Sequence, residues 1–170
     1  MFYFFDNYRF KIIFDRKSRK KNKIINYNSR NRINKIGLIL DDQFNLSEDF
    51  FNELADKLSV SRKKIKILIF NKQNNSNNSS DYLFNSDEFT FFGKLNGDLE
   101  TFSNESFDLL INYFNSNNNN RVNLLSLNSK KKFSVGFLNA DSKINDIIFS
   151  FSPNESNLFI EELAKYTKKI

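Results

Sequence analysis

Hydrophobic positions in this chain form short continuous runs separated by helical stripes. Ile36–Leu40 and Ile65–Phe70 are continuous apolar runs, which are typical of strands buried on both faces. Between them, apolar residues recur at helical spacing over residues 50–58, after Ser47, a suitable helix N-cap that is followed by two acids. A strand, a helix and a strand with short connections predict a βαβ unit and hence a parallel sheet.

The rest of the chain continues this alternation. Further strands are expected at 89–92, 108–113, 133–138 and 147–151. We interpret residues 71–87 as a polar loop, and expect a helical turn near Asp98 and a helix at 121–129. Ser152–Glu155 has the sequence of a capping box with Pro at the first helical position, which predicts a last helix. Residues 35–170 are therefore predicted to form one α/β domain, with a Rossmann-like, mostly parallel sheet of five or six strands and helices on both faces.

Positive charge is concentrated before this domain, in residues 1–34, which we call the basic arm. Residues 1–35 hold 11 Lys and Arg against two Asp, a net charge of +9, whereas the whole chain carries +6. Apolar positions 4, 5, 8, 12 and 13 fit one face of a short helix, and the stretch 16–23 is expected to be solvated. Such asymmetry indicates a polyanion or an acidic surface as the partner. The candidate nucleic-acid-binding residues are Arg9, Lys11, Arg16, Lys17, Arg19, Lys20, Lys21, Lys23, Arg30 and Arg32.

Composition excludes several kinds of chemistry. The 170 residues include no His and no Cys, so a Ser-His-Asp triad, a Cys–His pair, a thiolate or imidazole zinc site and a disulfide are all impossible. Four glycines at unrelated spacings do not form a phosphate-binding loop. We therefore expect no cofactor or metal and identify no small-molecule substrate. The apolar run Phe2–Phe5 is interrupted by charges and does not resemble a signal peptide, so we expect a cytoplasmic protein.

Polar residues follow several of the predicted strands and could line a ligand crevice, because open parallel sheets bind ligands at the carboxyl ends of their strands. The candidate crevice residues are Asp41, Asp42, Asn112, Asp141, Asn145 and Asp146. We call the four Asp of this set the carboxyl-edge acids. They could hold a cation or a ribose, or could act as an acidic pair. Turn formation and helix capping explain the same residue types more simply.

Three segments carry a resemblance to known families: Phe107–Tyr113 (FDLLINY), Lys132–Phe137 (KFSVGF) and Asn145–Phe149 (NDIIF). Together they resemble an uncharacterised bacterial family of small domains of unknown function, over roughly residues 35–170. More distantly, the pattern is similar to the N-terminal Rossmann-like half of heptosyltransferase-type glycosyltransferases. In those enzymes a second domain holds most of the sugar nucleotide, and the chain ends before such a domain. The resemblance thus implies the fold more than it implies catalysis.

These observations lead to one preferred functional hypothesis and two alternatives. The preferred one is a non-catalytic binding module whose arm contacts RNA or a ribonucleoprotein, since dense cations interleaved with aromatic residues suit phosphates and unpaired bases. The first alternative is a membrane-peripheral adaptor whose basic and aromatic arm binds an anionic membrane surface or a membrane protein. The second is a small or degenerate glycosyltransferase-like enzyme that uses the carboxyl-edge acids.

Overall fold

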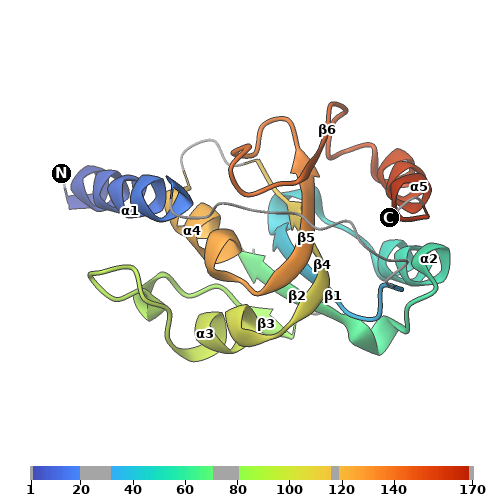
Figure 1. Cartoon of the computed structure of the whole chain (residues 1–170), viewed down its shortest axis with the longest axis horizontal. Coiled ribbons are helices and arrows are strands. Elements are labelled where there is room, and N and C mark those ends of the chain that lie inside the picture. Colours follow the sequence, from blue (N-terminus) through green and yellow to red (C-terminus); the bar gives the residue numbers. More distant parts are fainter. Residues whose placement is uncertain (1, 20–31, 71–80, 116–118, 169–170) are drawn as a thin grey trace.

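The computed structural model describes residues 2–19, 32–70, 81–115 and 119–168, with side chains from residue 7 onward. In this part of the chain, six parallel strands form one sheet in the order β3-β2-β1-β4-β5-β6 (Figure 1). The strands are β1 (Ile36–Asp41), β2 (Ile65–Phe70), β3 (Tyr82–Leu83), β4 (Phe107–Tyr113), β5 (Lys131–Phe137) and β6 (Ile147–Phe149). The predicted Rossmann-like α/β class is therefore confirmed.

The register places β1 at the centre of the sheet. Ile36 pairs with Ile65 of β2 on one side and with Leu109 of β4 on the other. The chain builds the sheet outward from β1 in one direction and then, from β4, in the other. The order thus reverses between β1 and β4, which makes their carboxyl ends the topological switch point where α/β proteins commonly bind ligands.

Helices cover both faces of the sheet, and each face has its own hydrophobic cluster. They are α1 (Phe2–Arg19), α2 (Glu48–Leu58), α3 (Gly97–Asn104), α4 (Asn120–Asn128) and α5 (Ser156–Thr167). The buried residues of α2 and α5 join one hydrophobic cluster, whereas those of α1, α3 and α4 join the other. Figure 1 shows α2 and α5 together on one side of the strands, with α1 and α4 neighbouring each other on the opposite side.

The first half of the basic arm is packed onto the domain, which the sequence did not predict. Phe10 and Phe14 of α1 are fully buried, and Phe10 meets the edge of the Phe89 ring at a centroid distance of 5.3 Å. The expected apolar face is wrong for Tyr8 and Ile12, which are 60 % and 46 % exposed, whereas Ile13 does pack against the core. A helix buries the side chains that face its neighbouring elements. Because α4 lies beside α1, Phe10 and Phe14 are on the buried side of the helix. The domain boundary at residue 34 stays a prediction.

Two local predictions are also wrong. Residues 89–92 are not a strand, since Phe89 makes a single antiparallel bridge with Leu95 and a tight turn lies between them. The strand β3 lies instead within the predicted loop 71–87. The last helix begins at Ser156 rather than at the predicted capping box. The Glu155 carboxylate accepts from the backbone N–H of Ser152 as in such a box, but the Ser152 hydroxyl accepts from Asn154 N–H.

Candidate functional site

The acids at the end of β1 are buried and serve the local backbone. Asp41 is the last residue of the strand, and its carboxylate accepts from the backbone N–H of Gln43 at 3.2 Å and from the Gln43 amide at 2.6 Å. It thereby caps the short 3-10 turn that Asp42 opens. Asp42 is buried as well. The contacts of Asp41 agree with the simpler interpretation of this residue as one that ends the strand and caps the following turn.

Of the remaining crevice candidates, Asn112 lies within β4 and not after it, and the other three lie in the connection between β5 and β6. The Asn112 amide donates to Asn145 Oδ1 at 2.7 Å, so these two predicted residues do meet. The other two candidates are used locally: the Asp146 carboxylate accepts from Ser134 N–H at 2.7 Å, and Asp141 accepts from a neighbouring N–H within its own turn. The described residues contain no group of three or more potential metal ligands.

Gly136 makes room for the Asn112–Asn145 contact. It lies opposite Asn112 in the β4–β5 pairing, and a Cβ at this position would be only 2.6 Å from the Asn145 amide. The contact leaves two buried atoms, Asn112 Oδ1 and Asn145 Nδ2, without a partner among the described residues. Leaving a buried polar atom of this kind without a partner costs about 1–3 kcal/mol of folding free energy. The Asn112–Asn145 pair therefore lowers the stability of the fold.

A shallow pocket of about 190 Å³, which was not predicted from the sequence, opens at the carboxyl ends of the strands. It lies beyond the ends of β4, β5 and β6, next to the start of α5. Its walls are Phe44, Asn115, Phe137, Leu138, Asn139, Ser150, Phe151, Ser152, Pro153 and Asn154. The lining combines three Phe with neutral Asn and Ser residues and has no charged side chain, and the buried Oδ1 of Asn115 has no partner within the described chain. The pocket has no group suited to acid–base catalysis.

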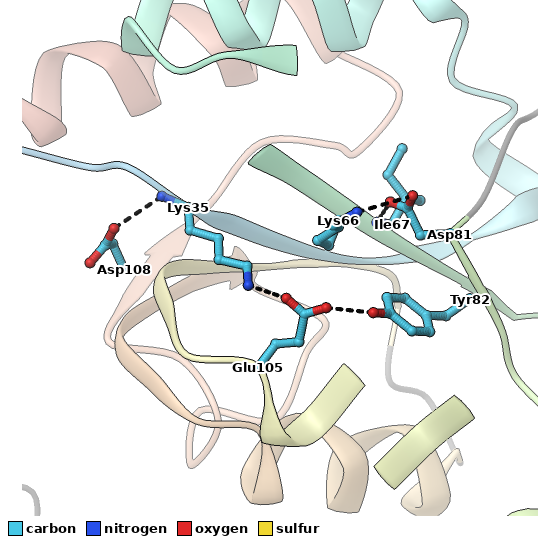
Figure 2. A network of polar contacts seen from close by, with 7 residues as sticks. All are labelled: Lys35, Lys66, Ile67, Asp81, Tyr82, Glu105 and Asp108. Carbon is cyan, nitrogen blue, oxygen red and sulfur yellow. Dashed lines mark hydrogen bonds and ion pairs between the residues drawn. The ribbon is translucent and has the colours of Figure 1, made fainter. Parts of the chain in front are cut away.

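The opposite edge of the sheet, at the amino ends of the strands, carries a paired charge network (Figure 2). The Glu105 carboxylate accepts from both the Lys35 ammonium and the Tyr82 hydroxyl. Burial alone would raise the pKa of Glu105, but the hydrogen bonds from Lys35 and Tyr82 outweigh it and lower that pKa. Burial and the Glu105 hydrogen bond raise the pKa of Tyr82 to about 12. The network ties β3 to the start of β1, so we interpret it as structural.

A second carboxylate at this edge anchors the segment that leads into β1. Asp108 accepts from the backbone N–H groups of Asn34 and Lys35 at 2.8 and 3.0 Å, and it pairs with Lys132 at 2.7 Å. Burial would raise the pKa of Asp108, yet these contacts together lower it. Asp108 therefore fixes the place where the chain leaves the basic arm and enters the sheet.

The described cations of the arm divide into two groups. Arg9 and Lys17 are used within the protein: the Arg9 guanidinium lies 4.2 Å from the centre of the Phe91 ring, and Lys17 donates to Asn128 of α4 at 3.1 Å. Burial lowers the pKa of Lys17. The exposed group is Lys11, Arg16, Arg19 and Arg32. The candidates Lys20, Lys21, Lys23 and Arg30 lie outside the described residues.

The outward side of α1 is thus a cationic surface with few opposing charges of its own. Its described acid, Asp15, is paired with Lys143 at 2.7 Å, and this contact outweighs burial and lowers the pKa of Asp15. Lys11 and Arg19 lie on the same side of the helix, one turn before and one turn after Asp15. An anion approaching this side of α1 therefore meets Lys11 and Arg19 as exposed positive charges, and Arg16 is exposed about 100° further round the helix from Asp15.

Two neighbouring aromatic residues, Phe91 and Phe92, project from the surface beside α1. They are 66 % and 77 % exposed, and their rings make an edge-on contact at 5.4 Å. Sequence reasoning missed them because it assigned residues 89–92 to a strand. The signal that could have revealed them is Gly93 directly after two large apolar residues, since a glycine there is typical of a tight turn.

The strand order and the helices on both faces define an α/β protein with Rossmann-type topology, and its charged surface lies on a docked N-terminal helix. Within that class, the chain belongs to a family of unknown function (DUF6913), whose model matches residues 8–170. The match thus includes most of α1 together with the whole sheet. No curated protein and no solved structure matches the chain. Among the described residues, none of the helices has the length and apolar character needed to cross a membrane.

Proposed function

We propose that this protein is a non-catalytic binding module of the cytoplasm that holds RNA or a ribonucleoprotein through the outward side of α1. The observation that carries the proposal is the docking of α1: Phe10 and Phe14 are buried in the domain, so Lys11, Arg16 and Arg19 are presented at fixed positions. Cations held in place lose less conformational entropy on binding than cations on a solvated tail.

The docked helix also supports binding through its remaining contacts. The Asn120 amide of α4 donates to Asn7 Oδ1 at 2.9 Å, and Lys17 reaches Asn128, so both ends of the described helix are held against α4. Each cation that neutralises a phosphate releases counterions, which makes the affinity strongly dependent on salt.

The membrane-peripheral alternative has one specific observation in its favour. Tyr8 and Ile12 are exposed next to the cations of α1, and an amphipathic basic helix with exposed apolar residues suits an anionic lipid surface. The glycosyltransferase-like alternative has less support, because Asp41 and Asp146 already accept hydrogen bonds from neighbouring groups.

The proposal is tested by replacing Lys11, Arg16 and Arg19 together by Gln in the full chain and measuring binding to a labelled single-stranded RNA across a salt series. Each lost phosphate contact reduces the slope of log K against log salt by about 0.7, so the variant should lower the slope by about 2. All RNA sequences should be affected alike, because phosphate contacts carry no base information.

The matched control removes the same number of charges elsewhere. Lys57, Lys63 and Lys64 are exposed near α2, on the other face of the sheet, and their replacement by Gln leaves the cations of α1 intact. This control should keep the wild-type slope. An equal loss in both variants would show that only net charge matters, and an absence of RNA binding by the wild-type protein would reject the proposal.

A further inference from the structure

Phe91 and Phe92 occupy the tip of a rigid turn. Gly93 N–H donates to the Thr90 carbonyl at 2.9 Å, and Thr90 N–H donates to the Lys94 carbonyl at 2.9 Å, so the two Phe are the central residues of a closed turn. Gly93 has a φ of +71°, which a residue with a side chain rarely adopts. Beneath the turn, Phe89 is buried against Phe10. The closed turn and the buried Phe89 therefore hold the two exposed rings at a fixed position on the surface.

The turn lies directly against α1, so the exposed rings share a surface with the nearest cations of that helix. A Cβ on Gly93 would lie 3.0 Å from the Ile13 side chain. The Arg9 guanidinium lies over the face of Phe91, at 4.2 Å from the ring centre. Arg9 is followed on α1 by the exposed Arg16 two helical turns later. The surface thus combines aromatic rings, a guanidinium plane and further cations.

We propose that the Phe91–Phe92 turn stacks on unpaired bases and that the RNA bound by this protein is single-stranded. This inference rests on the proposed function. Phosphates would pair with the exposed cations of α1 while a base stacks on Phe92, because aromatic rings and guanidinium planes are the usual stacking surfaces for bases splayed out of a strand. In a duplex the bases are already stacked on each other and cannot reach the ring.

The contact between Arg9 and Phe91 favours this partner over a lipid bilayer. Inserting the tip of the turn into a membrane would carry the guanidinium toward the hydrocarbon together with the ring, and a charged side chain is costly there. On an RNA strand the same arrangement has no such cost. The guanidinium stays in its place over Phe91, and the exposed ring of Phe92 is the surface on which a base would stack.

The test uses Phe92→Trp in the full chain, which contains no other Trp, so the substituted residue reports its own surroundings. Three probes are compared: a single-stranded RNA of about 12 nucleotides, the same RNA as a duplex, and a strand of equal length without bases. We expect the single strand to quench the Trp emission and the base-free strand to leave it unchanged. The duplex should bind with little quenching.

Two further substitutions separate stacking from apolar contact. Phe92→Ala should weaken binding of the single strand by about 5- to 140-fold, the range of one stacked base, and leave the base-free strand unaffected. Phe92→Leu keeps an apolar side chain without a ring and should lose nearly as much affinity. Both variants should keep the thermal midpoint of the wild type, because residue 92 is exposed.

The possible failures are distinguishable. Equal binding of the single strand and the base-free strand, without quenching, would overturn the stacking inference and leave phosphate binding by α1 intact. Absence of binding to every RNA probe would overturn both proposals. Vesicles of phosphatidylcholine and phosphatidylserine provide the last comparison. The turn would be a membrane-binding element, and the inference overturned, if vesicles shift the Trp emission to the blue, Phe92→Leu keeps its affinity for vesicles, and RNA causes no response.

Discussion

Replacing Phe10 by Ala tests whether α1 is part of the folded domain. The Phe10 ring is fully buried, meets Phe89 edge-on, and is flanked by the guanidinium of Arg121 at 4.7 Å from its centre. Truncating a buried Phe to Ala costs about 3–5 kcal/mol. The edge-on aromatic contact accounts for about 0.5–1.5 kcal/mol of this amount. We therefore expect the free energy of unfolding to fall by about 3–5 kcal/mol.

The assay is urea unfolding followed by far-UV circular dichroism, with Ile12→Ala as the control on the exposed side of the same helix. The control should change stability by no more than about 0.5 kcal/mol. If α1 were only loosely attached, the helix would detach in the variant and the loss could not exceed its small docking energy. Equal unfolding midpoints for Phe10→Ala and Ile12→Ala would therefore refute the packing argument and restore the solvated arm.

Three further predictions concern other parts of the fold. Glu105→Gln should make the stability of the fold less sensitive to acid. The pKa of Glu105 is lowered in the folded protein, so its ionised form contributes stability above the unfolded pKa, and that contribution is lost as pH falls through the folded pKa. Unfolding midpoints of wild type and variant that change in parallel from pH 6 to about pH 3 would contradict this. Glu155→Ala should destabilise the entry to α5 by about 0.5–2 kcal/mol, measured by urea unfolding with Glu161→Ala as an exposed control. Replacing the carboxyl-edge acids by Asn, one at a time, should leave the cellular role intact in a complementation assay, and loss of function in a folded variant would favour the enzyme alternative.

The sheet was predictable because its signals are local. Ile36–Leu40 and Ile65–Phe70 are continuous apolar runs, and both became central parallel strands with the expected helix between them. Ser47 caps that helix by accepting from Phe50 N–H, as its position before two acids suggested. In such segments, burial on both faces, helical spacing and cap chemistry all indicate the same structure.

The packing of α1 was not predictable, because charge and burial favour different interpretations of the same residues. The composition of residues 1–34 indicates a solvated arm, whereas Phe10 and Phe14 are separated by one helical turn and could equally be read as a buried stripe. Only the position of α4 decides between Phe10–Phe14 and Tyr8–Ile12 as the inward side. The turn at Phe91 and Phe92 was missed for a related reason, since consecutive aromatic residues are more often strand than surface.

The candidate sites differ in how much tertiary information they need. Asn112 and Asn145 were proposed from their positions after strands, and they do meet, although Asn112 lies within β4 and Asn145 lies just before β6. Their contact passes over Gly136 of β5, which the strand pattern alone could not show. The cationic surface could be defined only from the docked position of α1. That position shows that Arg9 and Lys17 contact other residues of the protein, whereas the other described cations of the arm are exposed. The net charge counts all of these cations equally, although Arg9 and Lys17 make contacts within the protein and the others are exposed.

The two sides of α1 make stability and binding separable in this protein. Phe10 and Phe14 face the domain and hold the helix, whereas Lys11, Arg16 and Arg19 are exposed and contribute little to the fold. Surface charges of this kind change unfolding free energies by only about 0.5 kcal/mol, yet they determine the salt dependence of polyanion binding. Deleting the whole arm would therefore remove both properties at once and could not distinguish them. Substitutions on one side of the helix at a time can, because each side affects one property and leaves the other unchanged.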